Sequence, residues 1–157
     1  MKEIWKSING FEGLYEVSNF GNVRSVDRLV NHHKGGKSLR KGKMLHPSLG
    51  NGYYGVILSK EGHIKRITIH RLVAEAFIPN PNNLPQINHK DENKLNNIYT
   101  NLEWCDCKYN IKYGSALDRM VNTKAKMGLI DPSHIGLPLK EINRLNNINY
   151  RKRKTQV

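Results

Sequence analysis

The sequence has no long hydrophobic run, only two cysteines and few acidic residues, and each of these shortages excludes some classes of protein. No apolar stretch approaches the roughly 18 residues that identify a membrane-spanning helix. The first residues also lack the charged and then apolar pattern of a secretory signal. We therefore expect a soluble, cytoplasmic protein with no membrane partner.

The only cysteines, Cys105 and Cys107, are separated by a single residue. Residues spaced in this way on a strand point to opposite faces, so the two thiols are poorly placed to form a disulfide with each other. A zinc site would need two more ligands, for which His70 or His89 could be proposed, but the spacing fits no common zinc pattern. We interpret both cysteines as ordinary reduced thiols.

Acidic residues number 13 against 26 lysines and arginines, which gives a net charge of +13. An excess of this size predicts a polyanionic partner, and nucleic acid is the first candidate. The hydrophobic content of 38% is low for one large core, so we expect several small cores along the chain.

The N-terminal third has the pattern of a small β-rich module. Tyr15 and Val17 alternate with polar neighbours, residues 19–22 have turn composition, and Val23 resumes a strand. Aromatic residues of so small a unit most often form its core.

A basic segment follows between residues 24 and 46, where the glycine pair Gly35–Gly36 allows the backbone to approach a phosphate closely. We predict a mobile loop that contacts DNA, in preference to a solvated loop without function. The predicted DNA contacts are Arg24, Arg28, Lys34, Lys37, Arg40, Lys41 and Lys43.

A β-hairpin and a helix are predicted next. Tyr54, Val56 and Leu58 lie at alternate positions, Glu61–Gly62 is typical of a hairpin turn, and Ile67 and Ile69 alternate on the return. Residues 70–77 have helical spacing, and Pro79 ends the helix. We expect His70 to be a partly buried residue that hydrogen-bonds the following segment, in preference to a catalytic role.

Residues 115–157 predict a basic arm. Ser115 and Asp118 have the spacing of a helix capping box, and Gly128 suits the position just after a helix. A second amphipathic segment leads to a basic cluster, and this arm is expected to lie along nucleic acid. Its predicted DNA contacts are Arg151, Lys152 and Arg153.

The stretch from residue 85 to residue 110 contains the candidate catalytic residues. A short strand ends in Asn88–His89, an asparagine-rich loop follows, and a second strand and a helix come after it. Neutral imidazole is a suitable base for activating water, and asparagine carbonyl oxygens are ligands for Mg²⁺ or Mn²⁺. His89 is the predicted general base, and Asn101 is expected to hold the other ring nitrogen with its side-chain oxygen.

The order His89, Asn101, Asn110 resembles the motif of the HNH endonucleases, and in particular the homing endonucleases of phages. Residues 5–25 and 70–74 are also similar to segments of that family. The resemblance implies a ββα-metal fold, with one divalent cation, Mg²⁺ or Mn²⁺, held in part by Asn110. It also implies that the chain acts as a monomer on double-stranded DNA in a bacterial or phage-infected cell.

Two residues depart from the family pattern. Asn88 stands where the family often has a metal-binding aspartate, and Glu92 stands where it often has glycine. We still expect Asn88 to be a metal ligand, although a neutral one.

These observations together predict an α+β protein with a β module at 1–52, a nuclease core at 53–114 and a helical basic arm at 115–157. The predicted function is metal-dependent DNA cleavage, with nicking preferred over a double-strand break because one chain supplies one base. The alternative is a DNA-binding regulator with a weak or inactive nuclease core. RNA binding is less favoured, because no aromatic pattern of an RNA-recognition motif is present.

Overall fold

The computed structural model describes residues 1–31, 35–129, 137, 141 and 144, and it divides into two compact units, Met1–Asp106 and Cys107–Val157. Among the predicted DNA contacts, Lys34, Arg151, Lys152 and Arg153 lie outside the described residues. The first unit joins the segments predicted as a β module at 1–52 and a nuclease core from residue 53, because buried residues from both form one core. Val17 and Val23 lie in the same cluster as Val56, Leu58 and Leu72.

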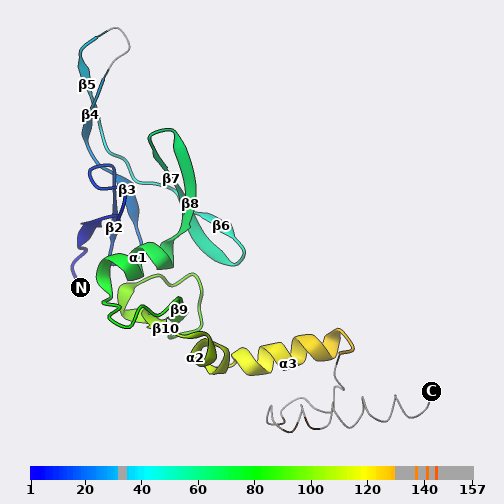
Figure 1. Cartoon of the computed structure of the whole chain (residues 1–157). Helices are drawn as coiled ribbons and strands as arrows, with labels where there is room; N and C mark the ends of the chain where they lie inside the picture. Colours follow the sequence, from blue (N-terminus) through cyan, green and yellow to red (C-terminus); the bar gives the residue numbers. More distant parts are fainter. Residues whose placement is uncertain (32–34, 130–136, 138–140, 142–143, 145–157) are drawn as a thin grey trace. The chain divides into compact units, whose positions relative to one another are not determined.

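The first unit contains small antiparallel sheets (Figure 1). Their strands are β1 (Trp5–Ser7), β2 (Tyr15–Ser18) and β3 (Val23–Ser25) in one sheet, β4 (Arg28–Asn31) and β5 (Lys37–Arg40) in a second, β6 (Ser48–Gly50), β7 (Tyr53–Lys60) and β8 (His63–Thr68) in a third, and β9 (Gln86–His89) and β10 (Leu102–Cys105) in a fourth. The predicted combination of helices and strands is therefore confirmed, in the form of several small sheets and few helices.

The predicted central hairpin and helix are confirmed. In β7, Val56 and Leu58 are buried while Ile57 between them is 59% exposed, which is the alternation of a half-buried strand. Glu61 and Gly62 both have positive φ angles, as a type I′ hairpin turn requires. Helix α1 (Ile69–Phe77) follows β8 directly and contacts β2, β7, β9 and β10, so it links the sheets of the unit.

The basic segment predicted as a mobile loop is instead a β-hairpin, β4–β5, with Arg28 directly opposite Arg40. In Figure 1 this hairpin extends from the β1–β2–β3 sheet. No apolar alternation in the sequence reveals this hairpin, because the pairing buries little: Leu29 and Leu39, also opposite each other, are 66% and 57% exposed. The antiparallel pairing of four residues on each strand holds the hairpin together, and Gly35 and Gly36, just before β5, both have positive φ angles.

The second unit contains α2 (Cys107–Lys112) and α3 (Ala116–Lys126). Ser115 is the N-cap residue of α3 but makes no capping hydrogen bond to the backbone, so the predicted capping box is incomplete. Gly128 has a φ of 68°, and Leu129 N donates to Lys124 O at 2.9 Å, as expected after a helix end. The second amphipathic segment lies outside the described residues. No described helix is long and apolar enough to span a membrane.

Candidate active site

The hairpin β9–β10 presents Asn88 and His89 at the end of its first strand. His89 lies opposite Leu102, and Asn88 lies opposite Glu103. Both are buried, with 5% of His89 and 6% of Asn88 exposed. Polar side chains this deeply buried need hydrogen-bond partners, and each has one in the hairpin or in the loop that closes it.

The His89 ring lies among other rings. The His70 ring meets it edge to face, with centroids 5.3 Å apart, and the Tyr53 ring lies 6.1 Å away. The pKa of His89 is lowered from its ordinary value chiefly because burial disfavours the imidazolium, and the Lys94 charge lowers it further. Asn97 and Asp91 act in the opposite direction. The imidazole is consequently neutral near pH 7 and able to accept a proton.

Asn97, which the sequence did not single out, contacts the imidazole. Its Oδ1 lies 3.4 Å from His89 Nε2, and its Nδ2 donates to Leu95 O at 3.2 Å. The second bond fixes the amide so that its oxygen faces the ring. Because an amide oxygen only accepts, the neutral imidazole carries its proton on Nε2, which leaves Nδ1 as the basic nitrogen.

Asn101 has a different role from the predicted contact with the imidazole. Its Oδ1 accepts from Asp91 N at 3.1 Å, and its Nδ2 donates to Asp91 Oδ1 at 2.8 Å and to Asn96 O at 2.9 Å. Lys90 N also donates to Asn101 O at 2.8 Å. Asn101 therefore clamps both ends of the loop that carries Asn97, and it supports His89 only through that loop.

Glu92 occupies a left-handed backbone conformation in this loop, with a φ of 59°. A residue with a Cβ pays about 1–2 kcal/mol for that conformation, whereas glycine does not. We expect Glu92→Gly to raise the free energy of unfolding by about 0.5–1 kcal/mol after the greater entropy of the unfolded chain is included. Urea unfolding of the two proteins measures this difference in the free energy of unfolding. Lys65→Gly, at an exposed position of β8, is the control and should destabilise.

His70 is the second residue of α1 and is partly buried, as predicted, but its hydrogen-bond partner is Thr68 and not the predicted catalytic hairpin. Its Nε2 lies 3.3 Å from Thr68 Oγ1, while its buried Nδ1 has no hydrogen-bond partner among the described residues. Burial, followed by the nearby His89 and Arg71, lowers the pKa of His70 to about 4. His70 therefore stays neutral beside His89 and adds no positive charge there near pH 7.

This pKa predicts a loss of stability in mild acid. The unfolded chain binds a proton to His70 below about pH 6.5, and the folded chain does so only near pH 4. The contribution of His70 to stability is therefore complete above pH 6.5 and is lost as the pH falls towards 4. Because His70 is partly exposed, we expect the free energy of unfolding to fall by only about 1–2 kcal/mol over this pH range. Urea unfolding at several pH values between 7.5 and 4.5 measures how steeply the free energy of unfolding falls with pH. His70→Gln should make this fall shallower, and an unchanged fall would contradict the prediction.

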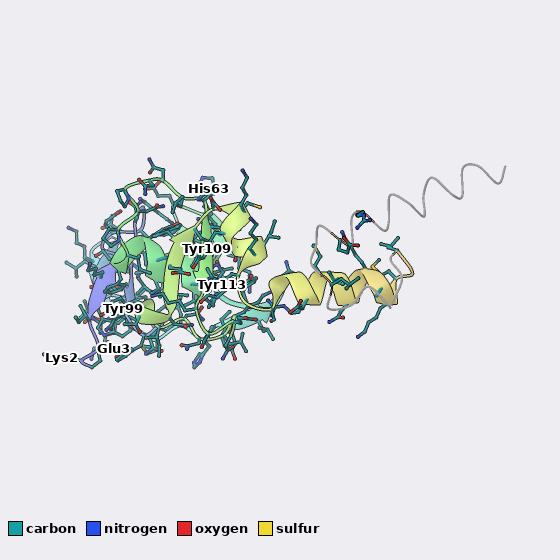
Figure 2. The ribbon with its side chains drawn as sticks, turned by 90° about the horizontal axis from the view of Figure 1, so that it is seen from below. Lys2, Glu3, His63, Tyr99, Tyr109 and Tyr113 are labelled. Atoms are coloured by element: carbon teal, nitrogen blue, oxygen red, sulfur yellow. The ribbon has the colours of Figure 1, made fainter. Side chains whose placement is uncertain are left out.

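The N-terminal β segment supports the same loop. Tyr99 N donates to Asn19 O at 3.0 Å, and the Asn19 side chain in turn bonds Ile4 N and Lys2 O. Figure 2 labels Lys2 and Tyr99 at the end of the unit where these bonds run. A Cβ on Gly21 would come within 3.0 Å of the Asn97 Cβ. The turn at Gly21 thus packs directly behind the residue that holds His89.

Oxygen atoms are the donors near Asn88. Among the described residues, no group of three or more His, Cys, Asp or Glu side chains is placed to hold a metal ion. The Asn88 amide, whose Nδ2 donates to Glu103, leaves its oxygen as a hard donor that would fit a divalent cation. Asn110 lies half-buried on α2 in the second unit, next to Tyr109, whose ring lies 5.5 Å from that of Tyr113 (Figure 2).

Basic side chains line a surface hollow of about 600 Å³ beside the β4–β5 hairpin. Arg28, Arg40, Lys41 and Lys43 all face it. Arg24 differs from these, since it pairs with Glu16 at 2.7 Å and stacks over the Trp5 ring. The hollow collects four of the predicted DNA contacts, while Arg24 is partly engaged within its own sheet.

Comparison with known proteins agrees with this geometry. Residues 3–59 match the NUMOD4 motif. A solved structure, described as DNA binding and cleavage by the HNH homing endonuclease I-HmuI, has a TM-score of 0.56 and 30% identity, over 94% of this chain and 68% of that chain. The chain belongs to the HNH homing endonuclease family.

Curated relatives of this HNH homing endonuclease chain include DNA endonuclease I-HmuI of Bacillus phage SP01, which is 40% identical over 69% of this chain and 55% of its own length. An uncharacterized HNH endonuclease of Acanthamoeba polyphaga mimivirus, L245, is 41% identical over 69% of this chain and 29% of its own length. The chain therefore spans about half or less of these relatives. HNH endonucleases generally use divalent metal ions, in keeping with the oxygen donors found here.

Proposed function

We propose that the chain is a metal-dependent endonuclease that nicks double-stranded DNA, with His89 as general base. The observation that carries the proposal is the buried, neutral imidazole whose Nε2 is held by Asn97, at the histidine of the family motif. In the reaction, His89 Nδ1 would take a proton from the attacking water. Asn97 stabilises the resulting imidazolium, because its oxygen accepts from Nε2.

Asn88 is the proposed ligand of the cation in this unit, and the cation would be Mg²⁺ or Mn²⁺ because an amide oxygen is a hard ligand. Asn110, in the second unit, stays a ligand predicted from the sequence. A bound cation would neutralise charge on the scissile phosphate and on the leaving oxygen. One chain carries one such base, which supports cleavage of one strand by a monomer. The basic hollow beside β4–β5 and the arm at 115–157 would hold DNA phosphates inside the host cell.

The direct test is incubation with supercoiled plasmid in Mg²⁺, Mn²⁺ or EDTA. We expect conversion to the nicked circle with either cation and none in EDTA. The alternative function, a DNA-binding regulator with an inactive core, is favoured only by the neutral Asn88. Retarded migration of DNA fragments without nicking in either cation would select that alternative.

The role of Asn97 predicts a specific kinetic defect. Asn97→Ala removes the acceptor that keeps the proton on Nε2, so part of the imidazole would present the wrong nitrogen to water. We expect the nicking rate under saturating enzyme to fall about tenfold while DNA affinity is unchanged. Asn96→Ala, at the neighbouring residue whose side chain bonds Asp91, is the control for damage to the loop. Equal losses in the two variants would show that Asn97 acts only through loop structure.

A further inference from the structure

Asn88 and Glu103 form a pair across the β9–β10 hairpin. They are directly opposite in register, and Asn88 Nδ2 donates to Glu103 Oε1 at 2.7 Å. Directly opposite residues of antiparallel strands share one face of the sheet. The pair is shielded, because Asn88 is 6% exposed and Glu103 is half-buried.

The chemistry of this pair fixes the orientation of the Asn88 amide. An ionised carboxylate can only accept hydrogen bonds, so the NH₂ group of Asn88 must face Glu103. The carbonyl oxygen Oδ1 then points to the other side of the amide. A charge-assisted bond of this length is stronger than one between neutral groups and holds the amide against rotation.

We propose that Glu103 is a positioning residue that keeps Asn88 Oδ1 turned towards the divalent cation. This inference rests on the proposed function, in which Asn88 is a metal ligand. A rotated amide would present NH₂ hydrogens to the cation, and these repel it. Glu103 therefore lets a neutral amide serve as a ligand.

The same pair gives a reason for asparagine at position 88. An aspartate there would place two carboxylates where the structure has a donor facing an acceptor. Two acceptors at that distance lose the hydrogen bond and repel each other. The negative charge of the pair is carried by Glu103 alone, on the opposite strand.

Two substitutions at position 103 separate orientation from charge. Glu103→Gln keeps an acceptor oxygen for the Asn88 amide, whereas Glu103→Leu removes it, and both remove the same charge. Mn²⁺ binding to the full chain can be followed by the electron paramagnetic resonance signal of free Mn²⁺. We expect Glu103→Leu to bind Mn²⁺ at least about fivefold more weakly than Glu103→Gln, as for other residues that orient a ligand.

Exchanging donor and acceptor tests the pair without any metal. In EDTA at pH 7.5, Asn88→Asp should lower the melting temperature by about 3–5 °C. In the double variant Asn88→Asp/Glu103→Gln, the glutamine NH₂ donates to the aspartate, so most of that loss should be recovered.

Equal Mn²⁺ affinities of the Gln and Leu variants would overturn the inference, as would a double variant that is no more stable than Asn88→Asp. Absence of Mn²⁺ binding to the wild-type chain would also overturn it. A wild-type chain that binds Mn²⁺ and shows the expected recovery but nicks no DNA would instead refute the proposed function. The two failures are therefore distinguishable.

Discussion

His89→Ala is expected to lower the nicking rate by about 100- to 10,000-fold, the range that a general base contributes. DNA affinity in EDTA should stay within about twofold, because a base acts in the transition state while the proposed phosphate contacts lie on the basic hairpin. Single-turnover nicking of supercoiled plasmid and fluorescence anisotropy with a labelled duplex measure the two quantities. Since burial lowers the pKa of His89, the wild-type rate should fall only at pH values below about 6.5.

A matched control is available in His63, an exposed histidine at the start of β8. His63→Ala removes the same kind of side chain and should nick at the wild-type rate. Folding of each variant is compared by urea unfolding. Nicking by His89→Ala at the wild-type rate would end its assignment as the base, and parallel loss of binding and nicking would indicate misfolding.

Much of the fold was predictable because the decisive signals are local. The alternation at Val56 and Leu58 and the turn at Glu61–Gly62 specify the β7–β8 hairpin without reference to other parts of the chain. Helix α1 follows from apolar spacing and ends before Pro79. The presence of β9, β10 and α2 in this order also agrees with the predicted strand, strand and helix.

The partner of His89 was not predictable from spacing. The loop between His89 and Leu102 contains asparagines at positions 93, 96, 97 and 101, and their order does not reveal which one meets the ring. The path of the loop decides it: Asn101 closes the loop on Asp91, and Asn97 is turned inward by its bond to Leu95 O. The packing of Gly21 behind Asn97 is equally hidden, because the two residues are distant in sequence.

Substitutions in the basic hairpin β4–β5 are expected to have a large effect on DNA affinity. Arg28 and Arg40 face each other across β4 and β5, and both line the hollow that also holds Lys41 and Lys43. Two like charges directly opposite on a ribbon destabilise it unless an anion lies between or beside them. Under the proposed function a DNA phosphate would supply that anion, which would explain the pair by binding rather than by folding.

Replacing both arginines by glutamine should therefore weaken duplex binding by about 10- to 100-fold near 0.1 M salt. The slope of log affinity against log salt should become shallower by about two units, since each lost phosphate contact removes about 0.9. Lys2→Gln/Lys65→Gln removes the same net charge from exposed positions and is the matched control for long-range attraction. If both double variants change the slope equally, the hairpin makes no special contact, and the basic surface acts only through its overall charge. If the arginine variant alone shows the change and its nicking rate at saturating enzyme is preserved, the hairpin holds DNA while His89 remains responsible for the chemistry.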